Sequence, residues 1–484
     1  MLKIVSKYQY FWPFKRGTIR DFYFISDIHL TETEDHTKFW KPYKASSISV
    51  HEGLIAFIEY IDDSSKFPVD LVLNGDFIDF RSIQHRPDGI LDRYGLSPNL
   101  KNSVWKISWI CHYHPHLFHA LSQFVFNGNR LHIVAGNHDL EFNFMAVRRV
   151  LRSELYKYAH KHNEKSDRRA FYKRILMYRN HYFERDLFYS EHGHMYDSFC
   201  SLPEERTLIW DHKKRNPRLL LPFGDLSSKY LSNALGYFNP YDVTSFLLTI
   251  REYIKVFIKY SLFSFRSMPL RWLKGALRTF FQIWLDARYL KIRKIHTKNM
   301  AISINPEDRR KILKLRRGAA SFNLPLIFRI LHLDKFFLGL VLFLSVVLPM
   351  VNSWLLLFSL LLIPTCIAFA DFRNRLKKMP QVCGTKMLQT GEAIQKILRV
   401  PYVVLSHTHI ADTLDTPIGT IVDTGTWAPI FEDREGKKPW KFGNSFFHIH
   451  VENKKITTEF KKWNGEKAVD FETPTGWRTR PHTT

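Results

Sequence analysis

Short apolar runs that end in polar residues recur in two parts of the chain. The first part has four such runs separated by stretches of helical periodicity, at 21–27, 70–76, 131–137 and 186–192. The second part has three, at 401–409, 420–427 and 444–451. Strand-like runs that alternate with helices are typical of an α/β domain. Because ligands in open α/β sheets bind beyond the carboxyl ends of the strands, the polar residues that end these runs predict a shared site.

A basic and aromatic segment separates the two parts. Residues 251–320 contain 18 Lys and Arg against 4 Asp and Glu, interleaved with Phe, Trp, Leu and Ile at helical spacing. Such an amphipathic cationic helix suits an anionic membrane interface, or an RNA- or partner-binding surface. A solvated basic face is the structural alternative.

Residues 336–370 form an uninterrupted stretch of 35 residues without a charged side chain. A bilayer core needs about 20 apolar residues, and a helix of 35 would be about 52 Å long, more than one ~30 Å hydrocarbon thickness and less than two. Pro349, Asn352 and Ser353 interrupt the stretch near its middle. Basic residues flank both ends, so we expect a hairpin or shallow anchor with both ends on the cytoplasmic side. Length alone also allows a single span.

The composition narrows the class of protein. The chain has 484 residues, of which 45% are hydrophobic and 24% charged, enough for two or three domains with cores of their own. This excludes a small disulfide scaffold, a disordered chain and a collagen-like chain. The four cysteines are scattered singly, and the N-terminus lacks a secretory signal pattern, so we expect a catalytic part in the cytoplasm. The net charge of +25 predicts attraction to phosphates.

Five blocks of ligand-type residues fall at the ends of the apolar runs. A carboxylate and an imidazole two residues apart can hold one divalent cation, a carboxylate with two oxygens can bridge two cations, and an amide oxygen is a further hard ligand. The blocks are Asp27-x-His29, Gly75-Asp76-x-x-Asp79, Gly136-Asn137-His138-Asp139, His192-Gly193-His194 and Ser406-His407-Thr408-His409.

These five blocks, in this order, resemble the signature of the calcineurin-like metallophosphoesterases. The resemblance covers about residues 21–210 and 400–450, and it implies an α/β fold, a four-layer α/β/β/α sandwich with a dinuclear metal site. It also implies attack on phosphorus by a metal-bound hydroxide, with Asp76 bridging two divalent cations, manganese best and iron, zinc or magnesium as alternatives. The implied ligands are Asp27, His29, Asp76 and His409 for one metal, and Asp76, Asn137, His192 and His407 for the other.

The resemblance also implies roles for residues beside the metals. His138 would stabilise charge on the phosphoryl group or protonate the leaving oxygen, and Asp139 would orient His138. Two interpretations of Asp79 are open: it orients a ligand, or it is an ordinary acid of the loop. Two are also open for His194: it has a substrate-side or ligand-orienting role, or it is a surface histidine. For Arg81 and Arg86, a phosphate contact and a structural role are both open interpretations.

The strings FISDIHL, LVLNGDFIDF and GNHD indicate a branch of this broad family. Phosphoprotein phosphatases carry arginines where this chain has Phe80 and Ala135, whereas the strings resemble the UDP-2,3-diacylglucosamine hydrolases and their relatives. Those enzymes cleave phosphodiester or pyrophosphate bonds, in some cases of lipids. The chain departs from them at His138, where they have Arg, at His194, where they have Asp, and at Ser406, where Gly is usual.

The metal-ligand blocks lie on both sides of the apolar segment, and His407 comes 215 positions after His192. A single crossing would put the ligands on opposite sides of a bilayer, so the chain must cross twice or not at all. We therefore expect two halves of one domain, 1–215 and 371–460, separated by a basic helical insertion at 216–335 and an apolar hairpin or anchor at 336–370, with a polar tail at 461–484.

The function predicted from these features is a membrane-associated phosphoesterase that acts on a phosphorylated lipid or nucleotide-lipid and binds anionic membrane lipids. A nuclease or nucleotide phosphodiesterase whose basic insertion binds nucleic acid is the first alternative. A non-catalytic membrane scaffold is the second.

Overall fold

A computed structural model describes most of the two ligand-bearing parts and portions of the insertion. The described residues are 19–32, 47–90, 92–162, 167–203, 208–209, 216–235, 254–255, 258, 268–288, 304–351, 384–428, 430, 443–452 and 455–471.

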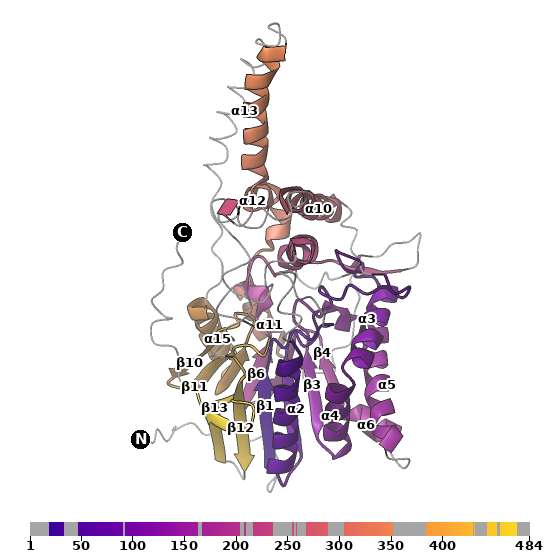
Figure 1. The fold of residues 1–484 in the computed structure, drawn as a ribbon. Coiled ribbons are helices and arrows are strands. Elements are labelled where there is room, and N and C mark those ends of the chain that lie inside the picture. The colour runs from indigo at the N-terminus through magenta and orange to yellow at the C-terminus, as the bar shows by residue number, and fades with distance from the viewer. Residues whose placement is uncertain are drawn as a thin grey trace.

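Two β-sheets form the centre of the fold (Figure 1). The seven-stranded sheet has the order β14 (Ala468–Asp470), β13 (Lys455–Trp463), β12 (Ser445–Glu452), β1 (Ile19–Ile25), β2 (Val69–Asn74), β3 (Arg130–Val134) and β4 (Ile175–Tyr178). The five-stranded sheet has the order β10 (Ala411–Thr416), β11 (Gly419–Thr424), β9 (Tyr402–Leu405), β6 (Phe188–Glu191) and β5 (His181–Glu184). Strands β1 to β4 are mutually parallel, as are β6, β9 and β11.

Three apolar cores order these elements into four layers. One core, which includes Phe57 and Leu121, joins the seven-stranded sheet to α2 (Ser47–Ser64), α3 (Leu100–Tyr113), α4 (Pro115–Phe126) and α5 (Met145–His162). A second, around Phe24 and Val404, lies between the sheets. The third packs the other face of the five-stranded sheet against α11 (Pro306–Leu315) and α15 (Gly384–Leu398). The α/β fold expected from the sequence is confirmed as a mixed α/β fold with two sheets.

Local sequence accounts for the helix starts beside the first sheet. Asn99 accepts a hydrogen bond from the backbone N–H of Asn102 at the start of α3, a typical helix cap. Pro115 occupies the first turn of α4, where a missing N–H costs nothing. The short helix α6 (Arg168–Lys173) begins at Asp167, whose carboxylate accepts from the N–H of Arg169.

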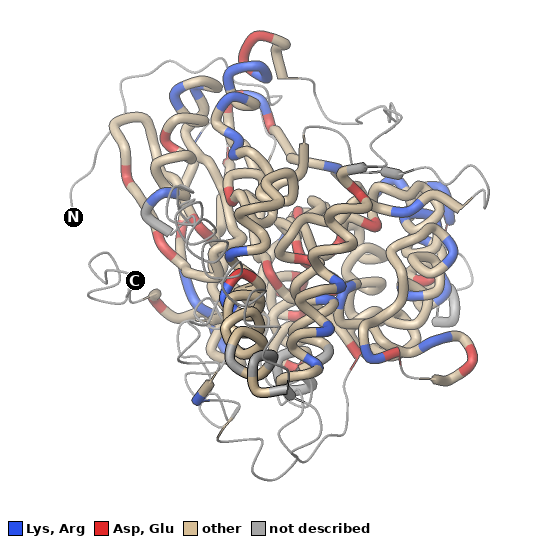
Figure 2. The backbone as a smooth tube through the Cα atoms, turned by 90° about the horizontal axis from the view of Figure 1, so that it is seen from above, with Lys and Arg blue, Asp and Glu red and all other residues tan. Residues whose placement is uncertain are grey.

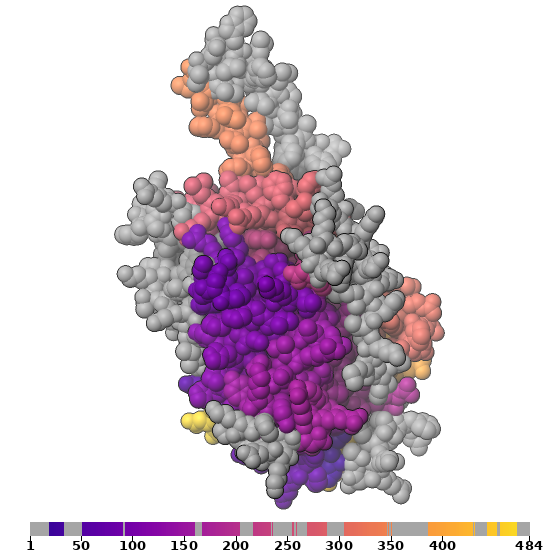
Figure 3. All heavy atoms as spheres, turned by 90° about the vertical axis from the view of Figure 1, so that its right-hand side faces the viewer, coloured from indigo at the N-terminus to yellow at the C-terminus, as the bar shows by residue number. Residues whose placement is uncertain are grey.

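Most of the described insertion lies beyond the carboxyl ends of the parallel strands (Figure 1), and Figure 3 shows its rose and orange segments above the first part of the chain. Its described elements are β8 (Arg218–Leu219), which pairs with β7 (Leu208–Ile209) of the first half, then α7 (Phe223–Ser227), the π-helical turn η3 (Ser228–Ser232), α8 (Asn233–Leu235), α10 (Met268–Arg288), α11, η4 (Ala320–Phe322), α12 (Leu324–Ile330) and the start of α13 (Leu333–Val351), which continues into the apolar segment. Helix α10 packs against α7, η3, α8 and α12, and α13 projects away from the domain.

The expected membrane segment coincides only in part with described residues. Helix α13 includes its first half, and 352–370 lie outside the described residues. Within the described ranges, no helix combines the length and apolar character needed to cross a bilayer.

The C-terminal boundary differs from the expected polar tail. Strand β13 runs to Trp463 and pairs with β14, so the seven-stranded sheet includes residues up to Asp470. The cause is Trp463, which is 1% exposed and packs against Phe57 of α2. Residues 472–484 lie outside the described part of the chain.

Candidate metal centre

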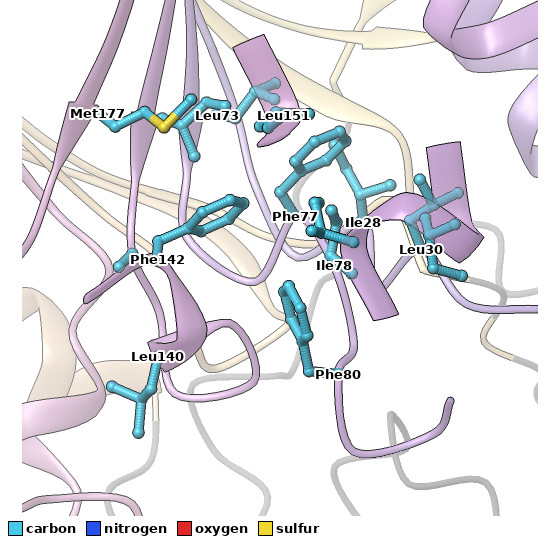
Figure 4. Packing of buried hydrophobic residues seen from close by; sticks show 14 of the residues in the cluster. Ile28, Leu30, Leu73, Phe77, Ile78, Phe80, Leu140, Phe142, Leu151 and Met177 are labelled. Carbon is cyan, nitrogen blue, oxygen red and sulfur yellow. The ribbon is translucent and has the colours of Figure 1, made fainter. Parts of the chain in front are cut away.

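Loops that follow parallel strands bring the predicted ligands to one edge of the two sheets. Asp27 follows β1, Asp76 follows β2, Asn137 follows β3, His192 follows β6 and His407 follows β9. Apolar residues of the first three loops pack together beneath the site, as Figure 4 shows for Ile28, Leu30, Phe77, Ile78, Phe80, Leu140 and Phe142. This packing holds the ligand loops against the core.

Five of the predicted ligands have left-handed backbone conformations. Their φ angles are +50° at Asp27, His29 and Asp76, +79° at His407 and +60° at His409. Such a conformation costs a non-glycine residue on the order of 1–3 kcal/mol and is concentrated at functional sites. The surrounding core therefore maintains a strained arrangement that turns these side chains toward one point.

Asp27, His29 and His409 form the first cluster of ligand atoms. His409 Nε2 lies 3.1 Å from Asp27 Oδ1 and 3.1 Å from His29 Nε2. His29 Nε2 is also 3.7 Å from Asp76 Oδ2. One carboxylate and two imidazoles at these separations are a suitable set for a divalent transition metal.

Asp76, His192 and His407 form the second cluster. His192 Nε2 lies 3.2 Å from Asp76 Oδ2, the same oxygen that faces His29. Asp76 therefore occupies the position between the clusters that a bridging carboxylate requires.

The residues present fit two divalent cations. Asn137 Oδ1 is buried without a hydrogen-bond partner, and Asp27 Oδ1 and His192 Nε2 are buried facing other candidate ligand atoms. Unpaired buried polar atoms are costly, and cations among them would remove that cost. The histidines also lower the pKa of Asp76 well below its ordinary value, against the raising effect of burial. The carboxylates are thus ionised and able to bind metal.

Ser406, which stands where the family signature has Gly, orients His192. Its Oγ donates to the carbonyl oxygen of Asn74 at 2.8 Å and lies 3.0 Å from His192 Nδ1. With Nδ1 engaged there, Nε2 of His192 is turned toward Asp76. The departure from the signature at this position was the signal that could have revealed this role.

Asp225 of α7 orients Asn137, and no motif in the sequence pointed to it. Asn137 Nδ2 donates to Asp225 Oδ1 at 2.9 Å, which fixes the amide so that Asn137 Oδ1 is the atom left for a cation. Asp225 Oδ2 lies 3.3 Å from Arg81 Nε, and Arg81 also pairs with Glu141. Arg81 is therefore structural rather than a phosphate contact. Arg86 is exposed and pairs with Asp88.

Asp79, and not Asp139, orients His138. Asp79 Oδ1 lies 2.9 Å from His138 Nδ1, which leaves Nε2 as the ring nitrogen available to a substrate. Burial lowers the pKa of His138, but Asp79 and Asp76 outweigh it and raise this pKa to about 10, so the ring is cationic at neutral pH.

The expected role of Asp139 is accordingly corrected. Its carboxylate accepts hydrogen bonds from the backbone N–H groups of Gly136, at 2.6 Å, and Phe77, at 2.9 Å. Because these groups belong to the loops after β3 and β2, Asp139 ties together the two loops that carry Asn137 and Asp76.

Two further residues of the loop after β6 lie beside His407. Asp197 Oδ2 is 3.3 Å from His407 Nε2, a contact that the sequence did not indicate. His194 is 5% exposed and its ring centroid is 5.4 Å from that of His192, so it is not the surface histidine of the alternative interpretation. Burial lowers the pKa of His194, which keeps its ring neutral.

Comparison with known proteins supports the chemistry that this geometry indicates. Residues 21–258 match the family model described as calcineurin-like phosphoesterase. The matched residues include Asp27, His29, Asp76, Asn137 and His192, and His407 and His409 complete the same clusters from beyond its limit. No curated protein matches the chain. Residues 21–258 therefore resemble a calcineurin-like phosphoesterase domain, His407 and His409 of the second part of the chain complete the ligand clusters, and the protein is a metal-dependent phosphoesterase, a hydrolase.

Proposed function

We propose that the protein hydrolyses a phosphodiester or pyrophosphate bond of a lipid-linked or headgroup substrate at the cytoplasmic surface of a membrane. The observation that carries this proposal is an exposed apolar face on α10. Leu270 is 68% exposed and Phe281 53%, and Trp284 and Leu285 are also exposed. Large exposed apolar patches of this kind mark interaction sites.

The position and charge of α10 support a lipid surface as the partner. The helix lies above the carboxyl ends of the strands, the same end of the domain as the metal ligands (Figure 1). Lys274 and Arg278 line a cavity of about 650 Å³ together with Leu270, Leu277 and Phe281. Apolar side chains beside cations suit anionic headgroups and acyl chains.

The mechanism assigns the following roles to the chain's own residues. Asp27, His29, Asp76 and His409 would hold one cation, and Asp76, Asn137, His192 and His407 the other. Two cations in such a site activate water and neutralise charge on the phosphoryl oxygens.

His138 would stabilise the charge that develops on the phosphoryl group or protonate the leaving oxygen through Nε2, with Asp79 holding the ring in place. Proton transfer of this kind typically contributes 10²–10⁴-fold to the rate. Asp225 and Ser406 would keep Asn137 and His192 directed at the cations.

The substrate class rests on the resemblance to UDP-2,3-diacylglucosamine hydrolases and on the apolar face. The alternative, a nuclease, draws its support from the net charge of +25. In the described residues Lys and Arg are interspersed with Asp and Glu when the domain is viewed from above (Figure 2), which favours the lipid proposal over a nucleic-acid track.

The first experiment measures manganese-dependent hydrolysis of an aryl phosphodiester by the wild type and by Asp76→Ala. We expect activity in the wild type that is lost in the variant. Equal activity in both proteins, or none in either with manganese, iron and zinc, would contradict the two-metal mechanism.

The second experiment measures sedimentation with vesicles of anionic or neutral phospholipid. Substituting Phe281→Ser and Trp284→Ser together should weaken binding to anionic vesicles at least about tenfold, since each buried aromatic side chain contributes about 1.5–3 kcal/mol. Phe67→Ser is the matched control, because Phe67 is 44% exposed and precedes β2, at the amino end of the strands. Binding to single-stranded DNA that falls steeply with salt, with no vesicle binding, would favour the nuclease instead.

A further inference from the structure

A second group of metal-type ligands lies at the opposite end of β1 from the catalytic site. Asp21 is near the start of β1, and Asp27 follows its end, so about 20 Å of extended chain separate the two. Strand β12 pairs with β1 in antiparallel register, which places His450 opposite Asp21 and His448 opposite Tyr23. Side chains two residues apart point to the same face, so Asp21, His448 and His450 converge.

The three side chains contact one another through a single carboxylate oxygen. His448 Nε2 and His450 Nδ1 each lie 2.8 Å from Asp21 Oδ1. Ser65, directly after α2, donates to the other oxygen, Asp21 Oδ2, at 3.0 Å. Asp21 is 6% exposed, whereas the His450 side chain is 33% exposed, so the cluster is anchored inside and open to solvent on one side.

These separations are close to those of a zinc site. Zinc binds histidine nitrogen and carboxylate oxygen at about 2.0–2.2 Å, which puts tetrahedral ligand atoms about 3.3–3.5 Å apart. The nitrogen–oxygen distances of 2.8 Å would therefore need to open by only about half an ångström. A water molecule from the solvent side would complete four ligands.

The surroundings support the protonation state that a metal requires. If His448 binds through Nε2 and His450 through Nδ1, their protons reside on His448 Nδ1 and His450 Nε2. Those nitrogens lie 4.0 Å from Glu459 Oε2 and 3.9 Å from Glu452 Oε2, respectively. Each glutamate would need to move about 1 Å closer to accept a hydrogen bond, and a carboxylate bonded in this way favours the required tautomer and strengthens the ligand.

The local charge also favours a cation. The cluster lies beside the C-terminal end of α2, an 18-residue helix whose dipole places partial negative charge there. Asp21, Glu452 and Glu459 add carboxylates, and of these Glu459 also pairs with Lys461 at 3.1 Å.

We propose that Asp21, His448 and His450 form a third metal site that binds zinc and is separate from the catalytic pair. The site joins β1 to β12, residues 427 and 429 apart in sequence. Bound zinc would link β1 of the first half of the domain to β12 of the second half, at the end of the sheet that the insertion does not cover. Its function is then structural, because binding energy at a site formed only on folding adds to stability.

The test compares zinc content and activity in full-length protein. Wild type, His450→Gln and Asp21→Asn are stripped with chelator, reloaded with zinc chloride and desalted, and bound zinc is measured by mass spectrometry. We expect each variant to retain one zinc fewer per chain than the wild type, with hydrolysis of the aryl phosphodiester unchanged. His85→Gln is the matched control, since His85 pairs with one carboxylate, Glu32 Oε2 at 2.8 Å, and should retain the wild-type zinc content.

Cobalt loading gives an independent readout. In an Asp76→Ala background, cobalt should produce visible absorption of a tetrahedral centre that His450→Gln abolishes, and zinc should raise the melting temperature only when His450 is present. Equal zinc content in wild type and both variants, with no cobalt spectrum that depends on His450, would show that the cluster is a hydrogen-bonded network only. Because metal content, cobalt absorption and melting temperature need no turnover, this result is independent of the proposed substrate.

Discussion

Replacement of Asp225 by asparagine is the perturbation that best tests how the insertion contributes to the metal centre. The Asn137 amide donates to Asp225 Oδ1 at 2.9 Å, and both side chains are buried. Burial raises the pKa of Asp225 to about 6, so the carboxylate is charged at neutral pH and the bond is charge-assisted. Asparagine keeps the shape of the side chain and removes the charge.

We expect Asp225→Asn to lower the affinity for metal and to leave catalysis by the metal-loaded enzyme largely intact. A hydrogen bond to a charged group contributes about 1.5–3 kcal/mol, which corresponds to about 10–100-fold in affinity. Groups that orient metal ligands typically have effects of the same size. The ligand Asn137 remains, so kcat at saturating metal should stay within a few-fold of the wild type.

The assay is a manganese titration of chelator-stripped enzyme, followed by hydrolysis of an aryl phosphodiester. The manganese concentration for half-maximal rate should rise about 10–100-fold in Asp225→Asn. Asp286→Asn is the matched control, because Asp286 of α10 pairs with Arg218 within the insertion and contacts no predicted ligand. A manganese dependence identical to the wild type, or a lower kcat at unchanged manganese dependence, would refute the assigned role.

Three further predictions concern the site and the core. His138→Gln should lower kcat by about 10²–10⁴-fold at unchanged metal content, measured by steady-state kinetics and mass spectrometry, and a smaller effect would remove the proton-transfer role. Gly136→Ala should abolish metal binding, because an added Cβ would lie 2.1 Å from Asp76 Oδ1, whereas Gly53→Ala has open space and should stabilise α2 by up to about 1 kcal/mol in urea denaturation. Burial would raise the pKa of Asp70, but His132 and two neighbouring arginines lower it to about 2. Its stabilisation of about 2 kcal/mol is therefore complete above pH ~4 and lost as the pH falls through ~2, so the stability difference between wild type and Asp70→Asn should shrink over this range.

The ligands could be predicted from the sequence because each follows a strand directly. The strand fixes the position of the loop, and the chemistry of the cation limits the residue type, so local spacing marked Asp27, Asp76 and Asn137 as candidates, and the resemblance to the metallophosphoesterases implied their assignment to two cations. The same logic located seven strands and missed β4, β5, β7, β8, β10, β13 and β14, none of which leads directly into one of the five ligand blocks.

The orienting residues could not be predicted in this way, since their positions depend on tertiary structure. Asp225 is 88 residues from Asn137, and its segment has no spacing that refers to the site. Asp139 illustrates the opposite error: it adjoins His138 in sequence, but its carboxylate points to the backbone of two loops while Asp79, 59 residues away, contacts the ring.

The insertion contacts residues of the metal centre at two places, so it is structurally part of the catalytic domain. Asp225 holds Asn137, a predicted ligand of the second cation. Arg316, just after α11, reaches Glu191 Oε1 at 3.5 Å, and Glu191 immediately precedes His192. A domain excised without the insertion would keep the ligands and Ser406, but it would lose Asp225, which directs Asn137, and Arg316, which pairs with the residue before His192. The insertion therefore belongs to the catalytic structure, and the apolar face of α10 is joined through α7 to the metal centre that it overlies.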